Sequence, residues 1–272
     1  MSLLQSISRP VSVAGLATML SLGVALAEPA KKEYEPQVGQ AGKDVIWVPT
    51  PQALVNKMLD MAKVVSTDVV YDLGSGDGRT VITAAKRGAT AQGIEYNPDM
   101  VELSKRNAAK EGVSDKANFM KADLFETDFT KANVVTMFLL PDINLRLRPK
   151  ILDMKPGTRI VSNSFDMGDW TPDEVAQAVD GCTSYCRANF WIVPAKVAGT
   201  WKLPQGELTL EQKYQVLNGS LKTANGTHQI SDGKMTGDQI TFKVNGQQYN
   251  GKVEGNTMSG DLVTAQWKAT KG

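Results

Sequence analysis

Histidine and cysteine are scarce in this chain, whose 272 residues include one histidine and two cysteines. A zinc site built from these side chains uses about four of them, so we expect no metal of that kind. A Ser-His-Asp triad would depend on His228. That residue stands close to an Asn-Gly pair, where an exposed turn residue is the simpler interpretation.

An excess of charge of either sign is also missing. Lys and Arg number 30, Asp and Glu number 29, and the net charge is +1. No overall field would recruit nucleic acid, so we expect no nucleic-acid partner. With 42% hydrophobic and 22% charged residues, the composition excludes collagen-like, wholly disordered and polytopic membrane proteins.

Long hydrophobic runs are confined to the N-terminus. Residues 10–27 carry no charge and end in Ala25-Leu26-Ala27, the small-x-small pattern that signal peptidase accepts. We therefore expect residues 1–27 to be a signal peptide and the protein to be exported to the periplasm. The alternative is a membrane anchor, because the run is close to the ~18–20 residues that span a bilayer. Residues 28–43 are expected to be an extended leader.

Short apolar strands alternate with helices from residue 44 to 198. Strands are predicted at 68–73, 91–95, 118–122, 134–140 and 159–164. Helices are predicted at 80–87, 98–110, 143–154 and 171–179, and another begins at Thr50-Pro51, with Thr50 as N-cap. Strands separated by such helices predict an α/β fold, a Rossmann-like, doubly wound and mostly parallel sheet.

Residues 199–272 have a different composition, with 11 of the 24 glycines and no arginine. Runs of alternating polarity predict strands at 207–217, 239–244 and 248–253. Hairpin turns are predicted at Asn218-Gly219, Asn225-Gly226, Asp232-Gly233 and Asn245-Gly246. We expect a separate, small antiparallel β domain, with a barrel as one arrangement.

The two cysteines, Cys182 and Cys186, are four residues apart. In a straight strand this spacing separates them by ~13 Å, which is beyond disulfide reach. A disulfide therefore requires a turn or helix between them. Two separate thiols are the alternative.

The strongest functional signal is the glycine loop that follows the strand at 68–73. The spacing from Asp72 through Gly74, Gly76 and Gly78 departs from the G-x-G-x-x-G of dinucleotide sites, because Arg79 stands where the third glycine would be. Asp72 and Asp77 would repel a pyrophosphate. S-adenosylmethionine has no phosphate and carries an ammonium and a sulfonium, so acids beside permissive glycines suit it better.

Two further acids follow the next strands. Glu95 ends the strand at 91–95, where a carboxylate can accept hydrogen bonds from both ribose hydroxyls of an adenosyl group. The alternative for Glu95 is a solvated acid at a strand end. Asp123 follows the third strand and is a candidate acceptor for the adenine amino group.

At these residues the chain resembles class I S-adenosylmethionine-dependent methyltransferases. The segments DLGSGDGRTVITAAKRGA, GIEYNPDMVELSKRNA, FLLPDIN and IVSNSFDMGDW, with the preceding Val48-Pro49-Thr50-Pro51, are similar to the ATP synthase c-subunit lysine methyltransferase family and its bacterial relatives. The resemblance implies that the cofactor is lined by Asp72, Gly74, Ser75, Gly76, Asp77, Gly78, Glu95 and Asp123. It also places Pro49 and Thr50 near the cofactor, in a segment that helps to close the pocket.

The acceptor side is expected at the end of the strand at 134–140, which lacks the N-P-P-Y type sequence of enzymes that methylate base amino groups. Asp142 is the first candidate for orienting or deprotonating an acceptor, with an N-cap role as the alternative. Asp166 and Trp170 are candidates for the pocket rim. We expect a methyltransferase whose acceptor is most simply a protein side-chain amine, that of lysine, with a small molecule or lipid as another acceptor class. The alternative is an exported, non-catalytic module that keeps this fold. In either case the β domain is a candidate for binding a protein or envelope partner.

Overall fold

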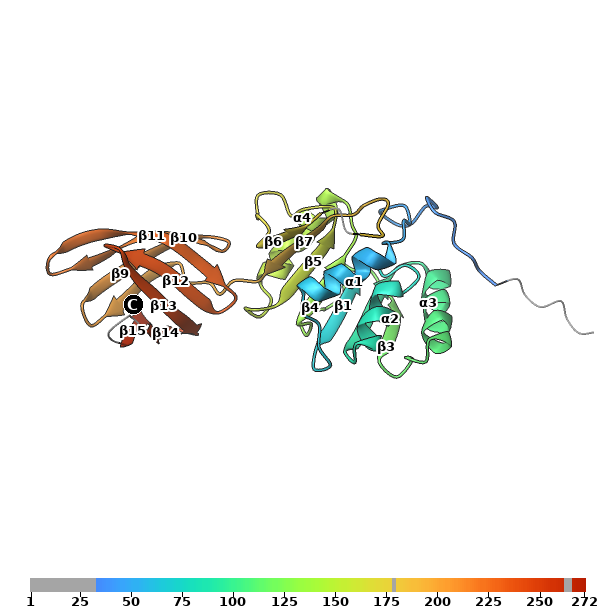
Figure 1. Cartoon of the computed structure of the whole chain (residues 1–272), viewed down its shortest axis with the longest axis horizontal. Helices are drawn as coiled ribbons and strands as arrows, with labels where there is room; N and C mark the ends of the chain where they lie inside the picture. Colours follow the sequence, from blue (N-terminus) through green and yellow to red (C-terminus); the bar gives the residue numbers. More distant parts are fainter. Residues whose placement is uncertain (1–32, 178–179, 262–265) are drawn as a thin grey trace, which may run out of the picture. The chain divides into compact units, whose positions relative to one another are not determined.

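The computed structural model of the chain describes residues 33–177, 180–261 and 266–272. The expected signal peptide or anchor at 1–27 lies outside these residues. No helix in the described part of the chain is long and apolar enough to cross a membrane. The described residues contain a mixed sheet with helices and, after it, an antiparallel barrel (Figure 1).

The first region is a seven-stranded sheet with the order β3-β2-β1-β4-β5-β7-β6. Strands β1 to β5 pair in parallel, whereas β7 pairs antiparallel with both β5 and β6. This arrangement confirms the predicted doubly wound, mostly parallel fold. The elements are α1 (Gln52–Met61), β1 (Val69–Leu73), α2 (Arg79–Lys86), β2 (Thr90–Glu95), α3 (Pro98–Lys110), β3 (Ala117–Lys121), β4 (Val134–Met137), α4 (Pro141–Leu152), β5 (Arg159–Asn163), β6 (Glu174–Ala176) and β7 (Ala188–Ile192).

The sheet is covered on both faces because its strands alternate their side chains between two hydrophobic clusters. Val134 belongs to the cluster with α1, α2 and α3, and the next residue, Val135, belongs to the cluster with α4. In the sheet, β2 and β3 lie on one side of β1, whereas β4 and β5 lie on its other side. In open α/β sheets, ligands bind at the carboxyl ends of strands where the order reverses in this way.

Two local predictions in this region are wrong. The helix α1 begins after Pro51, which is its N-cap, and the Thr50 side chain instead accepts a hydrogen bond from Asn163 Nδ2 at 3.2 Å. The helix predicted at 171–179 is absent from its described part, residues 171–177, where β6 pairs with β7. Asp173, expected inside that helix, accepts from the backbone N–H of Ile192 at 3.0 Å. Pairing with β7 has overridden the helix-capping sequence Thr171-Pro172-Asp173-Glu174.

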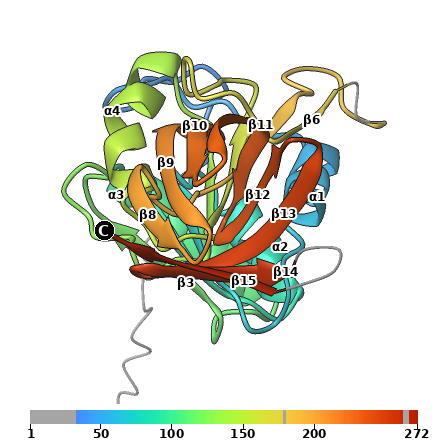
Figure 2. The same ribbon diagram turned by 90° about the vertical axis from the view of Figure 1, so that its left-hand side faces the viewer.

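The second region is a closed barrel, which confirms the predicted antiparallel β domain (Figure 2). Its strand order is β10-β11-β12-β13-β14-β15-β8-β9. Its core cluster is apolar and includes the fully buried Trp201 and Phe242. The strands are β8 (Gly199–Leu203), β9 (Gly206–Lys213), β10 (Val216–Thr223), β11 (Gly226–Thr236), β12 (Gln239–Val244), β13 (Gln247–Glu254), β14 (Thr257–Asp261) and β15 (Gln266–Lys271).

Several predicted strand and turn positions in the barrel are wrong. Asn218-Gly219 and Asp232-Gly233 lie inside β10 and β11, where the pairing register shifts, so they form bulges instead of hairpin turns. Bulges bend strands and increase their twist, which suits closure of a sheet into a barrel. The run predicted as one strand at 207–217 is divided by a turn at Tyr214. Tyr214 has a φ of 54° and stacks on Trp170 of the sheet region.

Candidate active site

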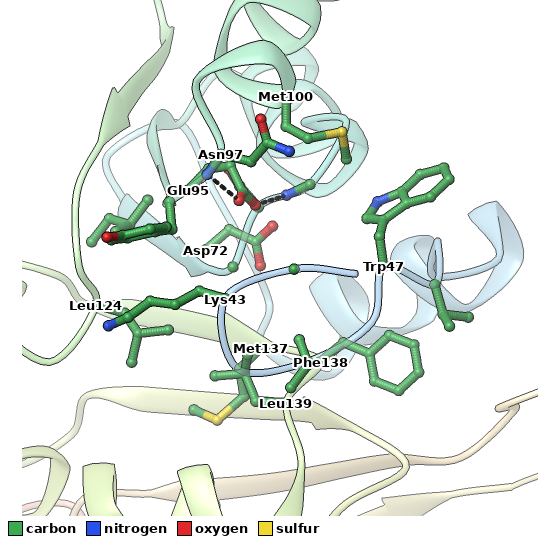
Figure 3. Close-up of a pocket in the computed structure, with 18 of the residues that line it drawn as sticks. Lys43, Trp47, Asp72, Glu95, Asn97, Met100, Leu124, Met137, Phe138 and Leu139 are labelled. Atoms are coloured by element: carbon green, nitrogen blue, oxygen red, sulfur yellow. Dashed lines mark hydrogen bonds between the residues drawn. The ribbon is translucent and has the colours of Figure 1, made fainter. Parts of the chain in front are cut away.

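A cavity lies at the carboxyl ends of β1, β2 and β4 and encloses about 1050 Å³, the solvent at its mouth included (Figure 3). Of the predicted cofactor-binding residues, those that line the cavity are Pro49, Thr50, Asp72, Gly74, Ser75, Gly76, Asp77, Glu95 and Asp123. Gly78 is the predicted residue that the structure places outside this lining. The chain thus brings together four acids and a glycine turn from separate strand ends.

The three loop glycines share a backbone requirement, and two of them also allow a close approach of neighbouring side chains. All have positive φ angles, 77° at Gly74, 54° at Gly76 and 83° at Gly78, which residues other than glycine rarely adopt. A Cβ on Gly76 would lie 2.6 Å from Trp47 Nε1 in the cavity wall. A Cβ on Gly78 would lie 2.8 Å from the Phe119 ring, behind the loop. Gly78 therefore allows the start of α2 to pack closely against the sheet.

Glu95 is held against the glycine loop by two backbone donors, as the dashed lines in Figure 3 show. Its Oε2 accepts from Gly76 N at 2.9 Å, and its Oε1 accepts from Asn97 N at 2.9 Å. An ionised carboxylate offers about four lone-pair positions, so each oxygen can accept one more hydrogen bond. The side chain is thus fixed in place and keeps acceptor capacity for two hydroxyls.

Asp72 is the buried acid of the site. Its carboxyl group is hydrogen-bonded to Thr136 Oγ1 at 2.7 Å. Burial is the main cause that raises its pKa to about 7, and the nearby carboxylates of Asp77 and Glu95 act in the same direction. A cation beside Asp72 would favour its ionised form, so this environment suits a positively charged ligand.

Asp77 is neutralised within the protein. Both of its carboxylate oxygens accept from the Arg79 guanidinium, at distances of 2.6 to 3.1 Å. Arg79 Nη1 also donates to the backbone carbonyl of Thr50 at 2.9 Å. Asp77 therefore anchors the segment before α1 to the glycine loop through Arg79.

Asp123 has a partner that the sequence did not predict. Its Oδ2 accepts from Lys43 Nζ, and its Oδ1 accepts from Phe125 N at 2.9 Å. The Lys43 hydrogen bond and the Phe125 N–H lower the pKa of Asp123. Lys43 Nζ also lies 4.9 Å from the centroid of the Tyr96 ring. A lysine ammonium is thus the donor to the carboxylate that we predicted as the acceptor for an adenine amino group.

The segment from Gln40 to Thr50 forms one wall of the cavity, and most of it was missed by sequence reasoning. Gly39 N donates to Trp47 O and Trp47 N donates to Gln40 O, so residues 39–47 turn back on themselves. The expected boundary between leader and domain, at residues 43 and 44, falls inside this turn. The apolar run Val45-Ile46-Trp47-Val48, just after the predicted leader, was the available signal.

The predicted acceptor-side residues lie outside the cavity lining. Asp142 is exposed in the first turn of α4, whose N-cap is Leu140, so the alternative N-cap role is wrong. Asp166 is also exposed, whereas Trp170 is fully buried and packs against Trp191. The border of the cavity at the end of β4 is formed by Met137, Phe138 and Leu139.

The donor and acceptor groups of this cavity fit S-adenosylmethionine. Glu95 offers acceptors for ribose hydroxyls, and Asp72 offers a buried carboxylate for a cationic group. Ser75 Oγ is buried and has no hydrogen-bond partner among the described residues. A buried hydroxyl of this kind indicates a missing polar partner, which a ligand can supply. Among the described residues there is no cluster of three or more His, Cys, Asp or Glu side chains that could hold a metal ion.

Known proteins are similar to this chain in sequence. The family model of the ANTKMT methyltransferase domain matches residues 72–174. The protein-lysine N-methyltransferase of Saccharolobus islandicus is 46% identical over 140 residues, which are 50% of this chain and 87% of that protein. The human lysine N-methyltransferase that acts on the ATP synthase c-subunit is 37% identical over 123 residues, 44% of this chain and 53% of that protein. This chain thus covers about half the length of the human relative.

A solved structure shows the same fold with a ligand related to the expected cofactor. An RNA methyltransferase from Salinibacter ruber, in complex with S-adenosyl-L-homocysteine, is 45% identical with a TM-score of 0.52. The match covers 55% of this chain and 96% of that chain. Together with the cavity and the lysine methyltransferase relatives, it shows that this chain belongs to the S-adenosylmethionine-dependent methyltransferase family.

Proposed function

We propose that the protein transfers a methyl group from S-adenosylmethionine to the side-chain amine of a lysine in another protein. The observation that carries this proposal is the apolar border of the cavity, where Met137, Phe138 and Leu139 follow the end of β4. Relatives named as protein-lysine N-methyltransferases, one of them matched over 87% of its length, support it. The tetramethylene stem of lysine suits such a border.

The chemistry that the cofactor supplies is a methyl group on a sulfonium. The chain binds and orients: the Glu95 carboxylate and the glycine loop hold one end of the ligand, and the Asp72 carboxylate balances positive charge. A lysine amine reacts only when neutral, and an apolar border lowers its pKa by disfavouring the ammonium. The released proton passes to solvent. Asp142 stays the candidate for orienting the approaching amine from outside the cavity.

A non-catalytic module is the less favoured alternative. Buried acids are costly for a protein that binds no cation, because burial penalises the charged form. Asp72 bears this cost, because burial raises the pKa of its carboxyl group to about 7.

We also propose that the protein is exported, with residues 1–27 as signal or anchor, and that the barrel engages a protein of the cell envelope. The Cys182–Cys186 disulfide supports export, since such bonds persist in oxidising compartments. Cell fractionation, with thiol alkylation of each fraction, tests the proposed export. A reduced protein found in the cytosolic fraction would contradict it.

Methyl transfer to two defined acceptors tests the main proposal. Purified protein is incubated with radiolabelled S-adenosylmethionine and either poly-L-lysine or a mixed-sequence RNA oligonucleotide. Amino-acid analysis of the first acceptor and nucleoside analysis of the second locate the label. We expect methyl-lysine with poly-L-lysine and no label in RNA, with loss of activity in Glu95→Ala. Label in RNA alone would overturn the lysine proposal and leave the methyltransferase assignment intact.

A further inference from the structure

Three aromatic rings meet beside the apolar border of the cavity. Phe138 follows β4 and lines the cavity (Figure 3), Phe165 follows β5, and Tyr185 belongs to the loop between the cysteines. The ring centroids of Phe138 and Phe165 are 6.0 Å apart, those of Phe138 and Tyr185 are 5.1 Å apart, and those of Phe165 and Tyr185 are 6.5 Å apart. We call these three rings the aromatic surface. It continues the cavity border outward into solvent, and Tyr185 is 46% exposed.

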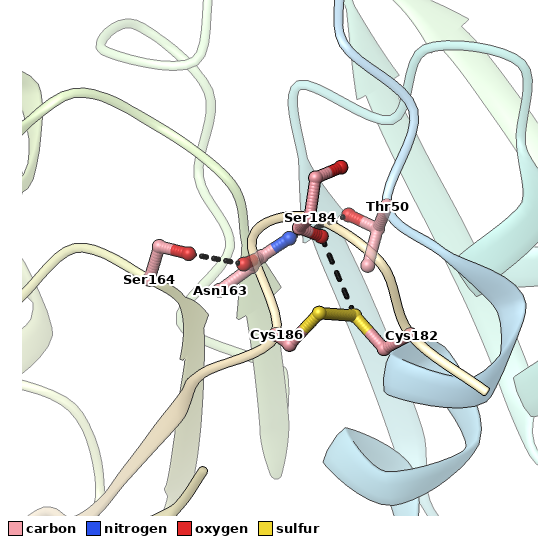
Figure 4. Close-up of a disulfide and its surroundings, with 6 residues drawn as sticks. All are labelled: Thr50, Asn163, Ser164, Cys182, Ser184 and Cys186. Atoms are coloured by element: carbon pink, nitrogen blue, oxygen red, sulfur yellow. Dashed lines mark hydrogen bonds between the residues drawn. A yellow bond between two sulfur atoms is a disulfide. The ribbon is translucent and has the colours of Figure 1, made fainter. Parts of the chain in front are cut away.

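Tyr185 is presented by a loop that a disulfide closes. Cys182 and Cys186 are bonded with their Cα atoms 5.6 Å apart, which a turn between them makes possible (Figure 4). The turn includes Tyr185 itself, with a φ of 51°. A bulky residue at positive φ needs its surroundings to hold it there. The disulfide supplies this restraint for Tyr185.

The loop after β5 is tied to the same place by hydrogen bonds. Ser164, with a φ of 59°, donates through its backbone N–H to Arg187 O at 2.7 Å. Asn189 Nδ2 donates to the backbone carbonyl of Phe165 at 3.3 Å. Phe165 and Tyr185 are therefore held next to one another by two connections that do not involve their rings.

Exposed carboxylates flank the aromatic surface. Asp142 lies four residues after Phe138, and Asp166 directly follows Phe165. Asn144 Nδ2 donates to the Asp166 carbonyl at 3.0 Å, which holds the first turns of α4 against this segment. Neither Asp142 nor Asp166 has an ion-pair partner within 4.0 Å among the described residues. Arg187, two residues after Tyr185, is exposed and donates to Asn189 Oδ1, so it is the cation of this edge. Two carboxylates and one guanidinium leave a net negative charge, which favours cations over phosphates.

We propose that Phe138, Phe165 and Tyr185 form the binding surface for the acceptor lysine side chain, and that the Cys182–Cys186 disulfide positions Tyr185 within it. The proposal rests on the lysine function proposed above. Aromatic faces bind the apolar stem of lysine, and cation–π attraction draws in its ammonium before the amine loses its proton to solvent at the apolar border. A nucleobase could also stack on such rings. The carboxylates of Asp142 and Asp166 oppose that occupant, because a base arrives with its phosphates.

Steady-state methylation of poly-L-lysine tests the surface. For Tyr185→Ala we expect KM for poly-L-lysine to rise about tenfold, with the affinity for S-adenosylhomocysteine unchanged by calorimetry. Tyr185→Phe keeps the ring and should retain the KM of the parent. Val216→Ala, an exposed apolar truncation in the barrel, is the matched control.

The disulfide arm uses the same assay after mild reduction. Reduction of the parent should raise KM for poly-L-lysine by a similar factor, whereas reduction of Tyr185→Ala should add little, because both changes act through the same ring. Cys182→Ser/Cys186→Ser should match the reduced parent, and S-adenosylhomocysteine affinity reports whether the fold is kept.

The outcomes separate this proposal from the one on which it rests. An unchanged KM in Tyr185→Ala, with active parent, overturns the aromatic surface and leaves the lysine function standing. Equal losses of S-adenosylhomocysteine affinity and of activity would assign Tyr185 a purely structural role and also overturn it. A parent that methylates the RNA oligonucleotide and not poly-L-lysine overturns both proposals.

Discussion

The sheet region and the barrel both bury substantial hydrophobic cores, but they treat polar groups differently. In the sheet region, parallel strands end at one edge, so Asp72 near the end of β1, Glu95 at the end of β2 and Phe138 just after β4 lie around one cavity. In the barrel, tight turns join antiparallel neighbours, and the interior is filled by side chains such as Trp201 and Phe242. Parallel strands concentrate loops from distant parts of the chain, and this is what creates a site.

The largest effect should come from the barrel core and should leave the site untouched. Phe242 is fully buried, stacks on Tyr249 at 4.7 Å and meets the edge of Trp267 at 5.9 Å. Phe242→Ala should lower the free energy of unfolding of the barrel by about 3–5 kcal/mol. Denaturant unfolding measures this, and calorimetry should show unchanged S-adenosylhomocysteine affinity. A parallel loss of affinity would show that the two regions are coupled.

The next effect concerns the buried acid of the site. The pKa of Asp72 is about 7 in the folded protein and ~3.9 in an unfolded chain. Between about pH 4 and 7 the folded state therefore holds a proton that the unfolded state has already released. The free energy of unfolding falls as pH rises through this window, by about 4 kcal/mol in total.

Comparing unfolding at pH 5 and pH 8 isolates this contribution. In Asp72→Asn the free energy of unfolding should no longer fall between pH 5 and pH 8 as it does in the parent. Asp232→Asn, in the barrel, should show the same fall as the parent. Equal pH dependence in the parent and in Asp72→Asn would show that the carboxyl group is ionised at low pH in the folded state as well.

A smaller effect is expected at the ribose acceptor. Glu95→Ala removes both charge-assisted acceptors and should weaken S-adenosylmethionine binding by about tenfold to over a hundredfold. Titration calorimetry measures this loss. Glu254→Ala, which removes an exposed carboxylate of the barrel, is the control and should bind as the parent does. Binding that is unaffected by Glu95→Ala would exclude the assigned cofactor position.

The smallest effect is expected at Lys43, whose ammonium occupies an oxygen of Asp123. A cofactor amino group that reached this carboxylate would compete with the lysine ammonium that is already hydrogen-bonded to it. Lys43→Met should therefore strengthen S-adenosylhomocysteine binding by about two- to fivefold. Lys57→Met, on α1, is the control. Weaker binding in Lys43→Met would show instead that the lysine itself contacts the cofactor.

Local sequence patterns predicted most of the sheet region because hydrophobic periodicity and glycine spacing act over a few residues. The helix predicted to begin at Thr50-Pro51 has apolar residues at helical spacing, and these four are buried: Leu54, Val55, Met58 and Leu59. The helix predicted at 98–110 begins as α3 at Pro98, where its N-cap Asn97 accepts through Oδ1 from Asp99 N at 2.9 Å. Both features depend on neighbours within one or two turns.

Patterns that compete with distant partners were predicted less well. The Thr171–Glu174 capping pattern yields to pairing of β6 with β7, and Asn218-Gly219 lies in a bulge because the barrel needs bent strands. Likewise, the contacts of Lys43 with Asp123 join residues 80 positions apart. Such contacts follow from the closed fold and leave no local pattern in the sequence.

Residue type and short-range spacing were enough to establish the fold class, the glycine loop and the acids that follow its strands. The folded arrangement was needed to learn which groups share the cavity, that burial raises the pKa of Asp72 to about 7, and that Phe138, Phe165 and Tyr185 meet. Desolvation and side-chain contact depend on what the rest of the chain places around a residue. Spacing along the sequence does not carry that information.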